Sequence, residues 1–121
     1  MKKNLVAILG ASDDKDRYSY LALMLLREHG YLPVPINPKL SKIEDVTVYQ
    51  TLSLAPVAST LTIYVNPKIS HQMQDEILKY PAKRVIFNPG TENFELAEKL
   101  RQKGVEVLEA CTLVMLKTGQ F

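Results

Sequence analysis

The alternation of short apolar runs with helical segments constrains the fold of this chain more than any other feature. Residues 5–9 (Leu-Val-Ala-Ile-Leu) form a continuous apolar run of strand length, and residues 32–36 form a second one. Between them leucines recur at helical spacing, and Gly30 is suited to end that helix in a left-handed conformation. Strands that are apolar throughout are typical of a parallel sheet covered by helices on both faces.

The same alternation continues along the rest of the chain. Further strands are expected at residues 60–65, 85–87 and 105–108, with a short β-like piece at 46–49 and a weak turn or helical segment at 52–58. Further helices are expected over residues 69–78, from a cap at Thr91 to Gly104, and as a short tail at 111–116. We therefore predict one α/β domain over residues 1–121, a Rossmann-like, three-layer, doubly wound sheet of about five parallel strands with helices on both faces.

Composition excludes several classes of function. The chain of 121 residues has the length of one domain, and its net charge of +2 comes from scattered Lys and Arg, which does not favour nucleic acid. Only five apolar residues follow the Met1 to Asn4 start, too few for a signal-peptide core or a membrane span, so we expect a cytoplasmic protein. One cysteine and two histidines do not make a spaced set of metal ligands, and no structural metal is expected. His29 is interpreted as a last-turn helix residue, and His71 as solvent-facing.

Candidate binding residues follow the ends of the predicted strands. In an open parallel sheet, ligands bind outside the carboxyl ends of the strands, where the strand order reverses. Three of these ends contain Asn-Pro, which turns the chain sharply and leaves an amide side chain able to donate and accept. A single Asn-Pro pair is most simply a turn, but three at one edge favour a binding role. The sequences at the five ends are Gly10-Ala11-Ser12, Asn37-Pro38, Asn66-Pro67, Asn88-Pro89-Gly90 and Glu109-Ala110-Cys111.

The first strand end has the character of a phosphate site. A helix start after Gly10 presents unpaired backbone N–H groups and the positive end of the helix dipole. Lys15 and Arg17 are cations beside this loop, and an arginine can bind phosphate through two parallel hydrogen bonds. Three aspartates, at positions 13, 14 and 16, offset part of that positive charge. A simple solvated loop is the alternative interpretation.

The usual nucleotide fingerprints are absent. A nicotinamide-cofactor loop needs glycine at its third and sixth places, which here hold Ser12 and Lys15. It also needs an acidic residue after the second strand for the ribose hydroxyls, and Asn37 stands there. The loop has no Gly-Lys-Ser/Thr ending, and no serine has a nucleophile-elbow setting. Cys111 could be a nucleophile only beside a base or a helix end, and an inert thiol is its default interpretation.

Taken together, these pieces resemble the small stand-alone CoA-binding proteins. Their Rossmann-like domain is similar to the amino-terminal domain of the α subunit of succinyl-CoA synthetase. The resemblance rests on the joint occurrence of Arg17-x-Ser19-Tyr20 and Pro35-x-Asn37-Pro38, and it covers nearly the whole chain. The matching segments are Val6 to Ser12, Arg17 to Tyr20, Glu28 to Tyr31 running to Pro38, Val48-Tyr49, Asn88 to Gly90, and Cys111.

The resemblance implies coenzyme A lying across the strand ends. By position, phosphate would meet Gly10, Ala11, Ser12 and Ser19, with Lys15 and Arg17 nearby and Tyr20 in the same motif. Asn37 and Pro38 would border the adenosine end, where an acidic side chain would repel the phosphate that CoA carries on its ribose. The pantetheine path would be lined by Val65, Asn66, Pro67, Asn88, Pro89 and Gly90, and Cys111 would lie towards the thiol end.

The function expected from the resemblance is non-catalytic binding of CoA or an acyl-CoA, with thiol exchange at Cys111 as a subsidiary hypothesis. One alternative is a partner-dependent subunit of a CoA-thioester enzyme of the acyl-CoA ligase type. A NAD-binding redox sensor is less favoured because the acidic residue for the ribose is missing. Neither a nucleic acid nor a membrane is expected as a partner, and a homodimer or another protein partner stays open.

Overall fold

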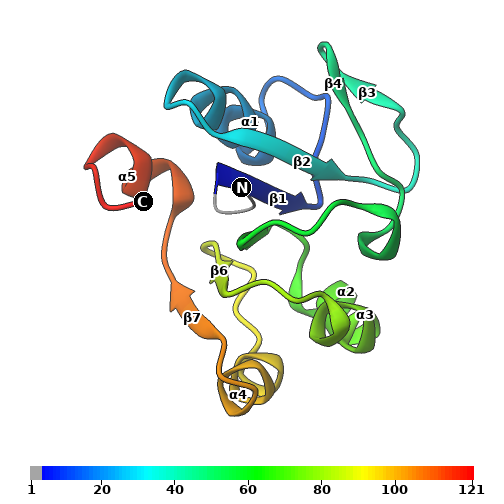
Figure 1. Cartoon of the computed structure of the whole chain (residues 1–121), viewed down its shortest axis with the longest axis vertical. Helices are drawn as coiled ribbons and strands as arrows, with labels where there is room; N and C mark the ends of the chain where they lie inside the picture. Colours follow the sequence, from blue (N-terminus) through cyan, green and yellow to red (C-terminus); the bar gives the residue numbers. More distant parts are fainter. Residues whose placement is uncertain (1–3) are drawn as a thin grey trace.

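The computed structural model describes residues 4–121 as one parallel sheet with helices on both faces (Figure 1). Met1 to Lys3 lie outside the described residues. The expectation of no signal peptide rests in part on these residues. The five strands have the order β2-β1-β5-β6-β7, and all neighbours are parallel. Their bounds are Leu5–Leu9 (β1), Leu32–Ile36 (β2), Thr60–Ile63 (β5), Arg84–Phe87 (β6) and Glu106–Glu109 (β7). The predicted Rossmann-like α/β fold is confirmed.

The strand order changes direction between β1 and β5. From β1 the chain passes to β2 on one side, and it returns to the other side of β1 with β5. Parallel neighbours need a crossover, and crossovers are right-handed. The change of direction therefore places helices on both faces of the sheet. The carboxyl ends of β1 and β5 therefore form the switch point where a ligand can approach backbone groups of two diverging loops.

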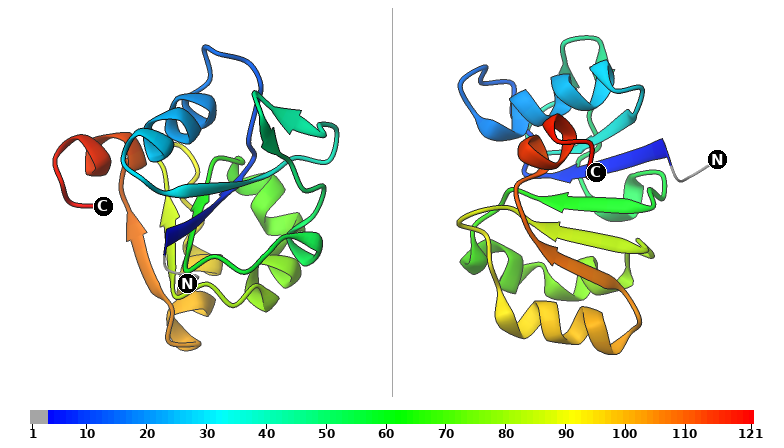
Figure 2. Two further views of the ribbon diagram at one scale, coloured as in Figure 1. Left: turned by 45° about the horizontal axis from the view of Figure 1, so that its top comes forward. Right: turned by 90° about the vertical axis from the view of Figure 1, so that its left-hand side faces the viewer.

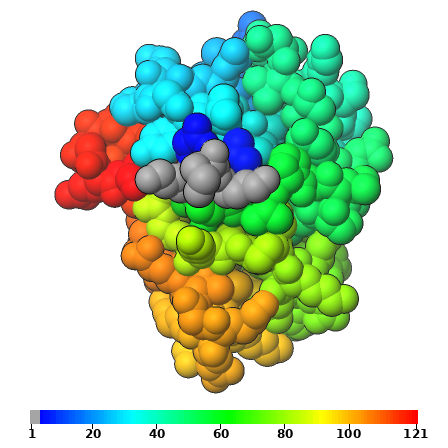
Figure 3. Space-filling model, in the orientation of Figure 1, coloured from blue at the N-terminus to red at the C-terminus, as the bar shows by residue number. Residues whose placement is uncertain are grey.

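The helices divide into two groups, one on each face of the sheet (Figure 2). One group is α1 (Tyr18–Glu28) and α5 (Thr112–Lys117), and the other is α2 (Pro67–Gln72), α3 (Gln74–Lys79) and α4 (Phe94–Gln102). In the space-filling view, the C-terminal segment projects as a lobe beside the rest of the molecule (Figure 3). No helix within residues 4–121 is long and apolar enough to cross a membrane.

Each face of the sheet has its own buried cluster. On the α1 side, Val6 and Ile8 of β1 pack with Leu23 and Leu26 of α1 and with Leu116 of α5. The alternate β1 residues, Ala7 and Leu9, join the cluster on the opposite face. That second cluster includes Leu61, Ile63, Phe87, Ile77, Leu96 and Leu100. Because β1 is buried on both faces, its sequence is apolar at every position rather than alternating.

The edge strand β2 carries two prolines at positions that face away from β1. The Tyr49 N–H donates to the Pro35 carbonyl at 2.9 Å, and the Gly10 N–H donates to the neighbouring Ile36 carbonyl at 3.2 Å. Since successive residues of a strand direct their backbone groups to opposite sides, Pro33 and Pro35 both face the outer edge. Their missing N–H groups therefore cost the sheet no ladder hydrogen bond.

A small hairpin, β3 (Lys42–Ile43) and β4 (Val46–Thr47), lies outside the main sheet and is tied to α1. The Tyr20 hydroxyl donates to Glu44 Oε2 at 2.6 Å, which raises the pKa of Tyr20. Arg27 Nη1 donates to Asp45 Oδ1 at 2.8 Å, and this hydrogen bond lowers the pKa of Asp45. The tip of the hairpin is thus fixed by side chains rather than by strand length.

Several predicted boundaries need correction. The strand expected at 60–65 ends at Ile63, and the β-like piece at 46–49 is strand only over Val46–Thr47. The helix expected over 69–78 is two short helices meeting at Met73, and the segment at 52–58 is a single turn, η2 (Leu52–Leu54). Thr91 does not cap α4, because Asn93 accepts from the Leu96 N–H there while the Thr91 hydroxyl donates to the Asn88 carbonyl.

Candidate functional site

A cavity of about 330 Å³ lies at the carboxyl ends of β1, β5 and β6. It therefore lies at the edge of the sheet where the strand order reverses. The residues that line it come from the β1–α1 loop, the first turn of α1, the residue after β5 and the loop after β6. They are Gly10, Ser12, Asp16, Arg17, Tyr18, Ser19, Tyr64, Pro89 and Thr91.

Gly10 allows two loops to approach each other at the base of this cavity. Its φ is +88°, and a Cβ there would lie 2.9 Å from Val65 Cγ1 and 3.1 Å from the Val65 backbone nitrogen. The Gly10 and Ala11 N–H groups both donate to the Ile36 carbonyl, at 3.2 and 3.1 Å. The turn is therefore held between the ends of β2 and β5, and a side chain at position 10 would force them apart.

The loop from Ser12 to Arg17 leads to an uncapped start of α1. Ser12 Oγ accepts from the Asp14 N–H at 3.0 Å, and Asp14 Oδ1 accepts from the Asp16 N–H at 3.0 Å. Arg17 occupies the N-cap position of α1 and makes no side-chain cap hydrogen bond. The first-turn N–H groups and the Arg17 guanidinium suit an anion at this point, while the Asp16 carboxylate on the same wall opposes it.

Both ends of the Asn37 amide form hydrogen bonds within the chain. Its Nδ2 donates to the Ala11 carbonyl at 2.7 Å, and its Oδ1 accepts from the Lys39 N–H at 2.7 Å. The residue therefore joins the loop after β2 to the loop after β1. Both functional ends of the side chain are used within the chain, and no carboxylate stands where a NAD site requires one.

Asn88 is the centre of a buried hydrogen-bond network beneath the cavity. It is 2% exposed, and its Nδ2 donates to Thr62 Oγ1 at 2.6 Å and to the Ile63 carbonyl at 2.9 Å. Its Oδ1 accepts from the Thr112 N–H at 2.9 Å, and the Thr62 and Thr112 hydroxyl oxygens are 2.8 Å apart. The side chain thus links β5, β6 and the start of α5.

Tyr64 lines the cavity and was not among the predicted site residues. Its hydroxyl oxygen is buried and has no hydrogen-bond partner among residues 4–121. Burial raises the pKa of Tyr64 to about 12, and the nearby Thr112 and Thr62 hydroxyls offset part of the rise without reaching hydrogen-bonding geometry. The ring packs with the cluster on the α1 side of the sheet. The tyrosine is therefore a neutral wall residue at ordinary pH.

The structure brings only part of the predicted site together around the cavity. Gly10, Ser12, Arg17, Ser19 and Pro89 line it. The other predicted residues lie near the same edge of the sheet without lining it: Ala11, Lys15, Tyr20, Asn37, Pro38, Val65, Asn66, Pro67, Asn88, Gly90 and Cys111.

Two of these have clear local roles. Asn66 caps α2 by accepting from the Ile69 N–H at 2.9 Å. Cys111, which is partly exposed, occupies the N-cap position of α5. The structure therefore assigns Asn66 to the start of a helix and places Cys111 one residue before the Thr112 N–H that Asn88 holds.

Four lining residues were missed by the sequence reasoning: Asp16, Tyr18, Tyr64 and Thr91. Asp16 and Tyr18 flank Arg17, so the same helix start indicated their position. Tyr64 follows a strand that ends earlier than expected, and Thr91 was assigned to a helix cap. Within the part of the chain that the structure describes, no group of three or more His, Cys, Asp or Glu residues is arranged to hold a metal ion.

The fold is an α/β domain of the Rossmann-like type with a cavity at its switch point. Comparison with known families is more specific, because a family model described as CoA binding domain matches residues 4–117. The chain belongs to this CoA-binding domain family.

Solved structures support the fold. A protein described as uncharacterized is 40% identical, with a TM-score of 0.90 and coverage of 98% of both chains. A hypothetical protein from Pyrococcus horikoshii OT3 is 27% identical, with a TM-score of 0.86, and the match covers 97% of this chain and 82% of that one. A dinucleotide-forming acetyl-coenzyme A synthetase from Ca. Korarchaeum cryptofilum is 21% identical, with a TM-score of 0.75. That match covers 88% of this chain and 26% of the synthetase.

Proposed function

We propose that the chain binds CoA or an acyl-CoA at the cavity formed by the ends of β1, β5 and β6, and that it does so without catalysing a reaction itself. The observation that carries this proposal is the lining of the cavity. A tight glycine turn, two serines and an arginine meet there at an uncapped helix start. Backbone N–H groups, hydroxyls and a guanidinium are the groups that bind a pyrophosphate.

The occupied amide of Asn37 supports CoA over NAD. A NAD site needs a free carboxylate to accept hydrogen bonds from the ribose hydroxyls, and Asn37 uses both ends of its amide on Ala11 and Lys39. A neutral residue at this place does not repel a phosphorylated ribose. Membership of the CoA-binding domain family agrees with this choice.

Calorimetry with CoA, acetyl-CoA, NAD and ATP tests the proposal. We expect heat from CoA or acetyl-CoA, and weakening of that binding by about tenfold in Arg17→Gln, because a charge-assisted contact to phosphate is lost. Arg101→Gln is the matched control, since Arg101 is an exposed arginine in the last turn of α4 and does not line the cavity. Absence of heat with both CoA species together with clear binding of NAD would contradict the proposal.

The finer part of the proposal concerns Cys111. The Cys111 thiolate would attack one sulfur of CoA disulfide, forming a protein–CoA mixed disulfide and releasing one CoA thiolate. Its partial exposure and its place after β7, beside the Asn88 network, support this step. Intact mass after incubation with CoA disulfide should show one CoA adduct that Cys111→Ser removes. An adduct that persists in this variant would rule out the assignment.

A further inference from the structure

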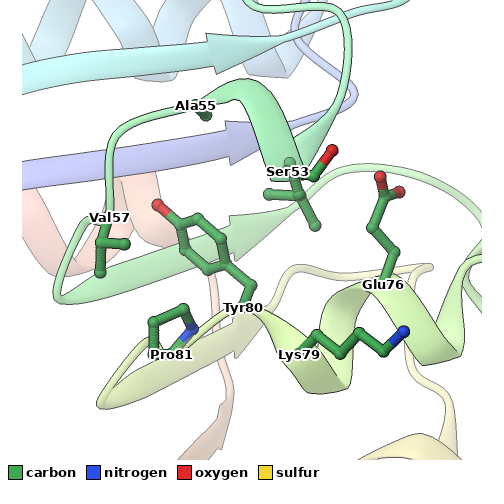
Figure 4. Close-up of a pocket in the computed structure, with 8 residues that line it drawn as sticks. Ser53, Ala55, Val57, Glu76, Lys79, Tyr80 and Pro81 are labelled. Carbon is green, nitrogen blue, oxygen red and sulfur yellow. The ribbon is translucent and has the colours of Figure 1, made fainter.

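A second cavity, of about 240 Å³, lies between η2 and α3, away from the candidate CoA site (Figure 4). Leu52, Val57, Tyr80 and Pro81 supply apolar walls, and Figure 4 shows Glu76 and Lys79 on the side opposite Val57 and Pro81. Val57 precedes β5 and Pro81 precedes β6, so this part of the cavity lies towards the amino ends of the strands. An occupant here would leave the carboxyl ends free.

The shape of this cavity is fixed by the Tyr80 hydroxyl. That group accepts from the Ala58 N–H at 2.7 Å and donates to the Pro56 carbonyl at 2.8 Å. The tyrosine ring is therefore held against the segment that leads into β5. Because the Tyr80 hydroxyl already donates one hydrogen bond and accepts another, it needs no polar group from a ligand. The cavity is therefore suited to an apolar side chain.

Leu54 provides such a side chain on the same surface. It stands between two residues that line the cavity, Ser53 and Ala55, but its own side chain is 67% exposed and does not line it. A two-fold axis that passes between Leu54 and the cavity would place the Leu54 of each copy opposite the cavity of the other. The surface is therefore self-complementary. The Leu54 side chains of two copies would then enter each other's cavities.

The charges at the rim have the same self-complementary character. Glu76 and Lys79 are three residues apart on α3, and neither forms an ion pair with another side chain among residues 4–121. When two copies of α3 run antiparallel across a two-fold axis, each Glu76 faces the Lys79 of the other copy. Opposite charges then meet twice, which selects this orientation over a parallel one.

We propose that η2 and α3 form the contact surface of a symmetric homodimer, with Leu54 seated in the cavity of the second copy and Glu76 paired with Lys79 across the axis. The occupant is a second copy of this chain rather than a small molecule or a different protein. The interface is separate from the candidate CoA site, so failure of one proposal would leave the other unaffected.

Sedimentation of the full chain over a concentration series gives the first test. We expect a concentration-dependent dimer whose dissociation constant rises by about tenfold or more in Leu54→Glu, because a buried apolar anchor becomes a charge. Val114→Glu is the matched control, since Val114 is also an exposed apolar residue, at 55%, and lies on α5. A chain that stays monomeric at all concentrations, or a dimer that Leu54→Glu leaves unchanged, would overturn the proposal.

Charge reversal gives a sharper second test. Glu76→Lys alone and Lys79→Glu alone should each weaken self-association, because like charges then meet twice across the axis. An equimolar mixture of these two variants should form heterodimers, since every cross-axis pair is then opposite in sign. Native mass spectrometry of the mixture distinguishes the species. A statistical mixture of homodimers and heterodimers, or an absence of association, would contradict the proposed pairing.

Discussion

At the scale of single residues, the buried amide of Asn88 forms three hydrogen bonds within the chain. Asn88 is a predicted pantetheine contact, yet its amide forms hydrogen bonds with β5 and α5. A buried amide with three partners fixes the relative position of the elements it joins. Its direct role is therefore to hold the edge of the sheet at which the ligand would bind.

Replacing Asn88 with alanine should lower the free energy of unfolding by about 3 kcal/mol, because the Thr112 N–H loses its buried acceptor and a void is left. Asn66→Ala is the comparison, since Asn66 is an exposed helix cap whose loss should cost about 1 kcal/mol. Urea denaturation of both variants measures the difference. Equal losses would show that the Asn88 network does not carry the extra stability.

Tyr64 predicts a dependence of stability on alkaline pH. Because burial raises the pKa of Tyr64 to about 12, the neutral phenol is favoured in the folded chain, and the resulting stability is lost as pH rises from the unfolded pKa towards the folded one. By pH 11 this group should have removed about 1 kcal/mol from the free energy of unfolding. Tyr64→Phe should lack that part of the decline. It should keep full stability at pH 7, since the Tyr64 hydroxyl has no hydrogen-bond partner among residues 4–121.

The difference between wild type and Tyr64→Phe is the informative quantity, because burial also raises the pKa of Tyr80 and adds to the alkaline loss in both proteins. Urea denaturation at pH 7, 9 and 11 gives this difference directly. Parallel curves for the two proteins over this range would show that the Tyr64 hydroxyl is more accessible than its burial indicates.

At the scale of elements, the loop between β1 and α1 depends on one glycine more than on the others. Gly10 and Gly30 both have positive φ, +88° and +85°, but only Gly10 has atoms within 4 Å of the position of a Cβ. Gly30→Ala should therefore cost about 1 kcal/mol for the backbone conformation alone. Gly10→Ala should cost about 2 to 3 kcal/mol and also weaken CoA binding, because the Val65 backbone must move. Thermal unfolding and calorimetry of the two variants separate these effects, and equal behaviour would contradict the steric argument.

The elements also show which parts of the fold a sequence can predict. β1 is a continuous apolar run buried on two faces, and the other strands each contain β-branched or apolar residues in a short run, which is a pattern local enough to read from the sequence. The β3–β4 hairpin has strands of two residues each, and Tyr20 and Arg27 of α1 hold its tip. Contacts between distant segments leave no periodic pattern, so the hairpin was not predicted.

The candidate site shows a similar division. The strand ends were located from the sequence because their turn residues are distinctive, as with Gly10 and Pro89, which line the cavity. The direction of each side chain was not predictable, because it depends on packing between elements. Asn88 is directed inward to the Thr112 N–H, while Tyr64, taken as strand interior, lines the cavity instead.

At the scale of the whole molecule, the two cavities belong to different ends of the sheet. The proposed dimer contact involves η2 and α3, and the proposed CoA site involves the carboxyl ends of β1, β5 and β6. Neither site includes a residue of the other. Ligand binding and self-association should therefore be energetically independent.

This independence can be measured with Leu54→Glu. CoA at a hundred times its dissociation constant should raise the free energy of unfolding by about 2.7 kcal/mol in the variant and in the wild type alike. Urea denaturation with and without CoA, at a protein concentration where the wild type is dimeric, provides the comparison. A smaller gain in the variant would show that the second copy contributes to the ligand site.

The prolines of β2 limit how copies of this chain can add to one another through their sheets. The outward-facing positions Pro33 and Pro35 offer no N–H, and the next outward N–H, that of Asn37, already donates to Tyr49. A strand from another copy finds no donors along this edge, whereas the outer edge of β7 pairs with no strand among residues 4–121. Growth by strand addition to the main sheet therefore has one usable end per molecule. Two copies joined at β7 would exhaust it, so this route stops at a pair and does not extend into a fibril.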